Sequence, residues 1–454
     1  MKTGIPAYLA GLLAASVLVA AVLVFPARAD ISKRKSPVVL AVEQAAPAVV
    51  NINTEQMIRQ SRGRSFGFND PFFDEFFRDF FERSPRRYTA TSLGSGVVID
   101  KRGYILTNEH VINRATSISV SLLSGKNYKA EVVGSDATLD LAILRIDAGE
   151  DLPTVRIGRS DDLMIGETVI AIGNPFGLSH TVSTGVISAL HRSIKASEDR
   201  IYPDFIQIDA SINPGNSGGP LLNIEGELIG VNTAIHGQGQ GIGFSIPINK
   251  ALRVVDDLIR YSEVRVGYSG LGVQELDPRT ARALRFDGTA GVAVSRIWES
   301  GPAEKAGIRP GDVITKVEQE NIFDVLEFDT VMRQYAPGDS VGMTYFRAGK
   351  EGSVRFTLAK FPRKTLSEMA WHRLGVRVSK AEGNAGVVVN RIRTRSSAQL
   401  IGMKTGDIVL RINNSKTDSI EDFYKAVSRL QYKSSALLLV QRGMYATAVT
   451  VGLE

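Results

Sequence analysis

The sequence predicts a mostly β protein with several domains: a large β-rich segment over residues 37–262, then two small α+β domains over residues 264–361 and 368–454. Three observations support this prediction. A chain of 454 residues is too long for a single hydrophobic core. Its first half carries short apolar runs separated by Gly, Pro and Asp turns, which is typical of a β-sandwich or a pair of β-barrels. Its second half contains an internal repeat.

The amino terminus indicates an export signal. Lys2 precedes an apolar run over residues 5–25, and Ala27 and Ala29 are the small residues that a signal peptidase requires. We therefore expect a signal peptide over residues 1–29. An uncleaved membrane anchor is the alternative, because a run of about 20 apolar residues also spans a bilayer. In both cases the body of the protein is expected to work outside the cytoplasm, with at most transient membrane contact through this segment.

The composition argues against several functional classes. The net charge is +6, but the basic residues are dispersed among 48 acidic ones, so nucleic acid is not an expected partner. The chain has no cysteine, which excludes disulfides and thiolate metal sites. It also carries no nucleotide-binding motif, metal-ligand cluster or dinucleotide fingerprint, so we expect no cofactor and no metal.

The first segment is predicted to begin with a helix-turn and a strand over residues 48–53, and to end with a helix over residues 249–261 that Asn249 caps. Ten short apolar runs between them are the expected strands, over residues 94–99, 104–107, 117–122, 129–134, 141–146, 168–172, 182–189, 205–208, 228–233 and 243–246.

An unusual insertion over residues 56–90 interrupts this pattern. Asp70 and Pro71 are typical of a helix start. The phenylalanines that follow recur every four residues and give the helix an aromatic face, at Phe72, Phe76 and Phe80 and at Phe73, Phe77 and Phe81. Such a face is either buried in its own core or part of an arm that docks on another subunit or protein.

Ser217 lies in a glycine-rich turn between two apolar runs, within the sequence NPGNSGGP. Gly215 and Gly218 allow positive φ, so successive N–H groups can point into one hole where an oxyanion would form. A glycine-rich turn that merely contains a serine is the alternative. The rest of the segment favours a nucleophile.

A serine nucleophile needs a base and a carboxylate that orients the base. His110 follows a strand and a short turn, and Asp140 opens an apolar strand. The other histidines lack this context, and Asp136, the competing carboxylate, follows Gly-Ser and indicates turn chemistry instead. The sequence therefore predicts a catalytic triad of His110, Asp140 and Ser217.

The blocks TNEHVI, LDLAIL and NPGNSGGP resemble the three signature motifs of the HtrA/DegP (protease Do) family, whose protease domain is a chymotrypsin-like double β-barrel. The resemblance implies that His110 is the general base, that Asp140 orients it and that Ser217 attacks the substrate. It also implies an oxyanion hole from backbone N–H groups of Gly215 and Ser217, with Asn216 as a further candidate. Asn216 carries no charge to pair with a new amino terminus, so activation is expected through loop ordering.

Further site residues follow from the same resemblance. It implies a pocket for small aliphatic residues at Ser211, Ile212 and Ile235, and a sensor loop over residues 190–204 that contains Arg192. The Phe-rich insertion resembles the family loop that reaches into a neighbouring protomer. Homotrimers, or multiples of trimers, are implied as the assembly.

The second half repeats its own motifs. We call residues 264–361 the first repeat and residues 368–454 the second repeat, with 360–367 as the expected linker. Both repeats resemble PDZ domains, in which a glycine loop holds a peptide carboxylate and a strand edge pairs with the peptide. Two β-rich domains that only assemble oligomers are the alternative. Residues 328–335 and 420–430 are the expected groove helices, and the carboxylate loops are expected at Gly270, Leu271 and Gly272 and at Leu374 and Gly375.

The function predicted from the sequence is an ATP-independent, periplasmic serine endopeptidase that degrades unfolded or damaged exported proteins and binds exposed carboxyl termini. Chaperone-like holding is expected beside proteolysis. Two alternatives stay open: a chaperone or scaffold with incidental proteolysis, and a membrane-tethered protease of one signalling protein.

Overall fold

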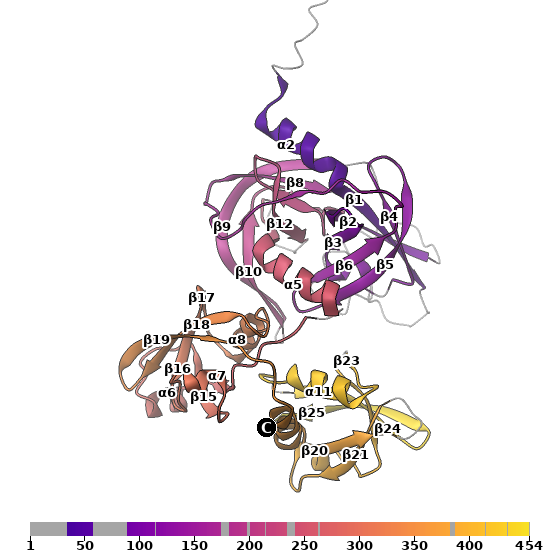
Figure 1. Ribbon diagram of the computed structural model, residues 1–454. Helices are drawn as coiled ribbons and strands as arrows, with labels where there is room; N and C mark the ends of the chain where they lie inside the picture. Colours follow the sequence, from indigo (N-terminus) through magenta and orange to yellow (C-terminus); the bar gives the residue numbers. More distant parts are fainter. Residues whose placement is uncertain are drawn as a thin grey trace, which may run out of the picture.

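The computed structural model describes residues 34–57, 89–113, 115–173, 181–197, 200–213, 215–233, 241–261, 264–381, 386–413, 415–433 and 435–453. Two β-barrels lie together, and two small α+β units follow them along the chain (Figure 1). The expected signal segment, residues 58–88 of the Phe-rich insertion, and Ile235 lie outside the described residues. Within the described residues, no helix has the length and the apolar character needed to cross a membrane.

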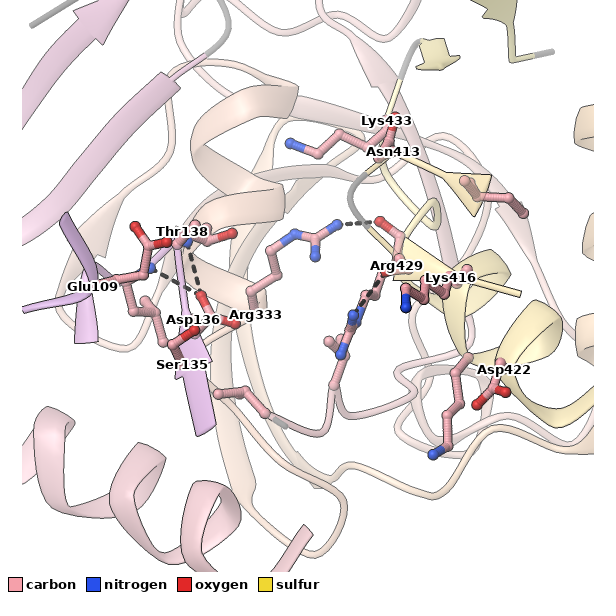
Figure 2. Close-up of a pocket in the computed structure, with 18 residues that line it drawn as sticks. Glu109, Ser135, Asp136, Thr138, Arg333, Asn413, Lys416, Asp422, Arg429 and Lys433 are labelled. Atoms are coloured by element: carbon pink, nitrogen blue, oxygen red, sulfur yellow. Dashed lines mark hydrogen bonds between the residues drawn. The ribbon is translucent and has the colours of Figure 1, made fainter. Parts of the chain in front are cut away.

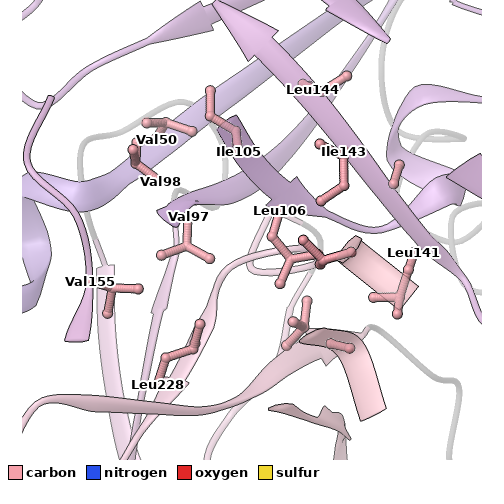
Figure 3. Close-up of a cluster of buried hydrophobic side chains, with 14 of the residues drawn as sticks. Val50, Val97, Val98, Ile105, Leu106, Leu141, Ile143, Leu144, Val155 and Leu228 are labelled. Carbon is pink, nitrogen blue, oxygen red and sulfur yellow. The ribbon is translucent and has the colours of Figure 1, made fainter. Parts of the chain in front are cut away.

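The first barrel is closed, in the strand order β1-β2-β3-β6-β5-β4. Helix α2 (Pro37–Ala45) and the turn η2 (Ala46–Ala48) lead into it, and Ser36 caps α2 by accepting the Val39 N–H. Branched aliphatic side chains such as Val97, Ile105 and Leu106 fill the interior and are fully buried (Figure 3). The strands are β1 (Val49–Met57), β2 (Thr89–Asp100), β3 (Tyr104–Thr107), β4 (Ser117–Ser121), β5 (Asn127–Asp136) and β6 (Leu141–Ile146), with the short helix α4 (Glu109–Ile112) after β3.

The second barrel has the strand order β11-β8-β9-β10-β13-β12-β7, and an additional pairing of β11 with β12 closes six of these strands into a ring. Helix α5 (Ile248–Tyr261) contacts strands of both barrels and buries Val254 and Leu258. The two barrels confirm the mostly β prediction. The strands are β7 (Arg156–Ile157), β8 (Thr168–Gly173), β9 (Thr181–Ser197), β10 (Arg200–Ile208), β11 (Pro220–Leu222), β12 (Glu227–Thr233) and β13 (Gly243–Pro247).

All ten predicted strands are present, and one detail of the prediction was wrong. Within the expected sensor loop, residues 190–197 continue β9 and residues 200–204 belong to β10, which the buried rings of Tyr202 and Phe205 anchor. The sensor role of this stretch stays a prediction. Asn249 does not cap α5, which already begins at Ile248. Its side chain instead accepts the Ser160 N–H at 3.2 Å and ties the helix start to a neighbouring loop.

The two repeats have the same topology, which confirms the internal repeat. The sheets run β14-β15-β16-β18-β19 and β20-β21-β22-β24-β25, with β17 on β16 and β23 on β22. The first repeat contains β14 (Leu271–Glu275), β15 (Val292–Ile297), β16 (Val313–Val317), β17 (Glu320–Asn321), β18 (Ser340–Arg347), β19 (Lys350–Thr357), α6 (Pro278–Ala283), α7 (Pro302–Lys305) and α8 (Val325–Met332). Helix α9 (Arg363–Met369) leads into the second repeat. The second repeat contains β20 (Val376–Lys380), β21 (Val387–Ile392), β22 (Ile408–Ile412), β23 (Ser415–Lys416), β24 (Ser435–Arg442), β25 (Tyr445–Gly452), η4 (Ala370–Leu374), α10 (Ser397–Leu400) and α11 (Ile420–Ser428).

The repeated Gly-Asp motif has a structural role in both units. Arg347 Nε donates to Asp312 at 2.6 Å, and Arg442 Nε donates to Asp407 at 2.7 Å. Both groove helices are present, but α8 starts three residues before the predicted position because the Asp324 side chain caps it. The predicted linker, residues 360–367, overlaps the helix α9, which begins at Arg363.

Candidate functional site

His110 and Asp140 form a buried pair in the first barrel. His110 Nδ1 lies 2.9 and 2.8 Å from the two carboxylate oxygens, and the His110 backbone N–H donates to Asp140 Oδ1 at 3.0 Å. The side chains are only 4% and 3% exposed. Because carboxylate oxygens only accept, Nδ1 carries the ring hydrogen of a neutral imidazole, and Nε2 is left as the basic nitrogen. The structure thus brings base and orienting carboxylate together as the sequence predicts.

Local structure places each partner. β3 ends at Thr107 and His110 lies in the single turn of α4 that follows. Asp140 has a φ of 53°, a left-handed conformation just before β6, and its carbonyl accepts from Asn108 Nδ2 at 2.9 Å. This bond connects the two catalytic turns directly.

Asp136 has the turn role expected from the sequence. Its Oδ1 accepts the N–H groups of Thr138 and Leu139 at 2.9 and 3.0 Å. These bonds hold the carboxylate in the turn that leads into Asp140.

Thr233 is a member of the site that sequence analysis missed. Its hydroxyl donates to Asp140 Oδ2 at 3.1 Å from the end of β12, in the second barrel. The side chain is 1% exposed. No motif around Thr233 signals this contact, because it depends on how the two barrels pack.

The turn around Ser217 is held by both barrels. Gly215 and Gly218 have φ values of 106° and 81°, as their predicted role requires. The Ser95 N–H donates to the Ser217 carbonyl at 2.8 Å, and the Gly218 N–H donates to the Asn232 carbonyl at 2.8 Å. A Cβ at Gly218 would lie 2.2 Å from the Ser95 carbonyl oxygen, so no larger residue fits. Ser217 itself is buried, at 1% exposed.

The turn also bears on the expected oxyanion donors. The Asn216 N–H donates to the Asn213 carbonyl at 2.9 Å and is therefore committed to the turn in this conformation. A role of Asn216 as an oxyanion donor would require this bond to break. The oxyanion role of Gly215, Asn216 and Ser217 therefore stays a prediction.

The structure describes two of the three residues expected to form the specificity pocket. Ser211 is exposed, and its carbonyl accepts from Ser183 Oγ at 2.8 Å. Ile212 is half-buried beside Gly243, where a Cβ would lie 2.8 Å from Ile212 Cγ1. The third expected residue, Ile235, lies outside the described residues.

A cluster of titratable side chains joins the β9–β10 hairpin to the first repeat. His191, which precedes the exposed Arg192, lies 2.9 Å from Asp204 and 3.8 Å from Glu320 on β17. Burial, together with the negative charge of Asp204, raises the pKa of Glu320 to about 7. Burial also lowers the pKa of Lys250 to about 8. His191, Asp204 and Glu320 each offer one atom that could bind a metal ion, and these three atoms lie within 4.8 Å of one another. The positive charge of the Lys250 amine acts on the same carboxylates and would compete with a bound cation.

The expected carboxylate loops adopt the required left-handed turns, with φ values of 78° at Gly270 and 82° at Gly375. Two of their N–H groups are already engaged, however. The Leu271 N–H donates to Ser269 Oγ at 3.1 Å, and the Gly375 N–H donates to the Ala370 carbonyl at 3.0 Å. In this conformation these two N–H groups are engaged within the protein, and the role of the loops in holding a peptide carboxylate stays a prediction. Leu374 is buried and Gly272 is half-buried.

The fold and the site agree with the families that match the chain. The family of trypsin-like peptidase domains matches residues 94–231, and the PDZ domain family matches residues 267–358 and 372–453. The protein is therefore a serine endopeptidase of the trypsin-like class with two PDZ domains.

Relatives cover nearly the whole chain. A probable periplasmic serine endoprotease, DegP-like, of Ectopseudomonas mendocina is 36% identical over 91% of this chain and 93% of the relative. The periplasmic serine endoprotease DegP of Escherichia coli is 35% identical over 88% of this chain and 89% of its own length. The solved HtrA-type protease AlgW with decapeptide is 39% identical and covers 72% of this chain and 99% of its own, with a TM-score of 0.51. The chain belongs to the HtrA/DegP family of serine endoproteases.

Proposed function

We propose that this protein is a periplasmic, ATP-independent endopeptidase that degrades unfolded or damaged exported proteins. The His110–Asp140 pair carries the proposal, because a buried imidazole held on both carboxylate oxygens is prepared to take a proton on Nε2. In the proposed reaction, Ser217 gives its proton to His110 and attacks the peptide carbonyl. The oxyanion is held by N–H groups of Gly215 and Ser217, and His110 then protonates the leaving amine. Water hydrolyses the acyl-enzyme by the reverse proton path.

The rest of the chain supports this substrate class. The relatives are named periplasmic, which agrees with an export segment over residues 1–29 that is removed on secretion. The solved AlgW protease is described with a decapeptide, and PDZ domains bind exposed carboxyl termini, so the two PDZ domains of this chain supply two candidate peptide sites. We further propose domain limits of 37–262, 264–361 and 368–454, a pocket at Ser211, Ile212 and Ile235, and a homotrimer that sedimentation would identify.

A matched pair of proteins tests the function. The wild type and Ser217→Ala are incubated with a chemically unfolded, reduced protein and with the same protein in its native form. We expect fragments from the wild type and the unfolded substrate only, without added nucleotide. If both proteins suppress aggregation equally and neither yields fragments, the holding scaffold replaces the protease as the main function. Mass determination of the exported protein shows whether the chain begins after Ala29.

A further inference from the structure

The edge strand of the first repeat is the expected peptide site. Among the described residues, β14 ends the sheet and pairs with β15 only, and α8 lies beside it. An extended peptide adds to such an edge, and its terminal carboxylate meets the N–H groups that precede the strand. In the described part of the chain, another segment of the protein already lies there.

Residues 429–433, the stretch after α11 in the second repeat, contact the start of β14. Gln431 Nε2 donates to the Leu271 carbonyl at 3.2 Å and to Ser269 Oγ at 3.3 Å. The Tyr432 hydroxyl lies 2.7 Å from the same Ser269 Oγ, which also accepts the Leu271 N–H. Side chains of the second repeat therefore engage the polar groups where a peptide carboxylate would arrive.

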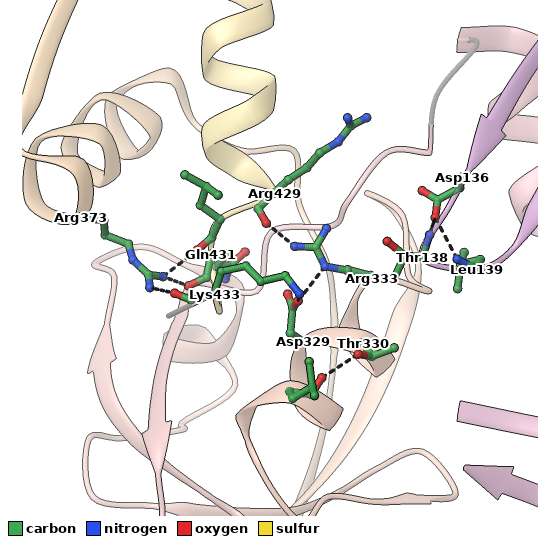
Figure 4. A network of polar contacts seen from close by, with 12 residues as sticks. Asp136, Thr138, Leu139, Asp329, Thr330, Arg333, Arg373, Arg429, Gln431 and Lys433 are labelled. Atoms are coloured by element: carbon green, nitrogen blue, oxygen red, sulfur yellow. Dashed lines mark hydrogen bonds and ion pairs between the residues drawn. The ribbon is translucent and has the colours of Figure 1, made fainter. Parts of the chain in front are cut away.

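The same segment contacts the helix on the other side of the groove. The Tyr432 ring meets Phe328 of α8 edge-on, with the centroids 4.9 Å apart. Lys433 Nζ lies 2.9 Å from Asp329, and the Arg333 guanidinium donates to the Arg429 carbonyl (Figure 4). Residues 429–433 thus reach both walls, the strand and the helix.

Arg373, at the end of η4, fixes the backbone of this segment. Its guanidinium donates to the Leu430 carbonyl at 2.9 Å and also to the carbonyls of Gln431 and Lys433. Because the guanidinium of Arg373 is planar and rigid, these three bonds hold the backbone of residues 430–433 in one conformation.

Three side chains of the contact are buried. Gln431 is 3% exposed, Tyr432 5% and Asp329 2%. Burial by itself would raise the pKa of Asp329, but the charges of Arg333 and Lys433 outweigh it and lower that pKa. Separation of the repeats would expose the Tyr432 ring and remove one of the two cations from the Asp329 carboxylate. The docked arrangement is therefore a defined state with a free-energy cost of opening.

We propose that residues 429–433 act as an internal ligand of the first repeat, so that an external peptide binds at β14 only after the second repeat is released. This inference rests on the peptide-binding role proposed above. An external peptide and the second repeat therefore compete for one site. Because the repeats must first separate, the free energy of opening lowers the apparent affinity for the external peptide.

Release also affects the surroundings of the catalytic pair. The docked second repeat borders a cavity of about 580 Å³, which residues of the first barrel, the first repeat and the second repeat line together (Figure 2). Glu109 and the turn 135–139 line it from the first barrel, and Lys425 and Arg429 line it from the second repeat. Glu109 adjoins His110 and the turn leads into Asp140, so peptide binding at β14 would uncover the segments that carry both residues.

Two measurements on the full-length protein test the inference. The first is the affinity for a fluorescent synthetic peptide with the sequence of residues 427–434. The second is energy transfer between dyes on Lys350→Cys and Met444→Cys, which label one repeat each in a chain without native cysteine. Tyr432→Ala and Lys433→Glu are expected to bind the peptide at least tenfold more tightly than the wild type and to lower the energy transfer. Saturating peptide should lower the transfer in the wild type as well.

Controls and outcomes separate the two hypotheses. Tyr445→Ala and Lys404→Glu change the same residue types at exposed positions of the second repeat, away from its edge strand β20, and should leave both measurements unchanged. Unfolding curves verify that each variant is folded, and Lys433→Glu avoids a cavity in the contact. Lower transfer in both variants without peptide binding to any form contradicts the peptide-binding role and leaves the docked contact standing. Wild-type affinity and wild-type transfer in both folded variants overturn the internal ligand.

Discussion

Thr233 tests the geometry of the catalytic pair most directly. Its hydroxyl donates to Asp140 Oδ2 at 3.1 Å, the same oxygen that lies 2.8 Å from His110 Nδ1. Thr233→Val keeps the shape of this buried side chain and deletes the bond. A hydrogen bond to a charged group contributes about 1.5–3 kcal/mol. Since Asp140 keeps both of its contacts with His110, we expect the lower end of that range.

A loss of about 1.5 kcal/mol from the transition state is about a tenfold loss of rate. We expect kcat to fall by about that factor while KM stays within about twofold, because Thr233 supports the imidazolium and not substrate binding. Steady-state kinetics on a short quenched-fluorescent peptide measure both constants. A short peptide keeps the assay independent of the PDZ domains.

The matched control is Thr330→Val in α8. Thr330 is also buried, at 3% exposed, and its hydroxyl donates to the Leu326 carbonyl at 2.7 Å, so the same chemical change occurs far along the chain from the catalytic pair. We expect wild-type kcat from it. Wild-type kcat from a folded Thr233→Val protein would refute the role given to this hydroxyl.

Three further predictions follow from single contacts. Gly218→Ala should abolish activity and lower the free energy of unfolding by about 2–4 kcal/mol, because it adds a clash to a positive φ; Gly125→Ala, with a φ of 83° and open space, should cost only about 1 kcal/mol in the same denaturation assay. In the folded protein Glu320 keeps its proton up to about pH 7, whereas in the unfolded chain it loses the proton near pH 4.5. Its contribution to the free energy of unfolding therefore falls as the pH rises between these two values. Glu320→Gln should flatten this pH dependence in urea titrations, and an unchanged dependence would contradict the raised pKa. Asp407→Asn should destabilise the second repeat by about 2 kcal/mol, seen by calorimetry, and leave short-peptide cleavage unchanged; equal loss of both would show that the ion pair also supports catalysis.

Most of the fold follows from local sequence. The apolar runs of both barrels are short and bounded by turn residues, so each strand could be placed without knowing its partners. The repeated Gly-Asp motif likewise marked two equivalent units, because in each unit the same buried aspartate pairs with an arginine on a later strand. The element ends were less certain, as α8 shows: one Asp324 side chain moved its start.

The candidate site was predictable where function requires particular residue types. His110, Asp140 and the glycine-flanked Ser217 each stand in a motif that chemistry constrains. Thr233 stands in none, and its contact exists only because β12 of the second barrel ends beside the first.

The sequence by itself determined the mostly β architecture and the two repeats and named the candidate catalytic residues, because periodicity and turn chemistry act over a few residues. Only the tertiary structure decided which groups are already engaged. It committed the Asn216 N–H to a turn, placed residues 190–197 in β9 and residues 200–204 in β10, and set Gln431 and Tyr432 against β14. Such contacts join residues far apart in the chain, and they depend on packing angles and register that no local pattern encodes.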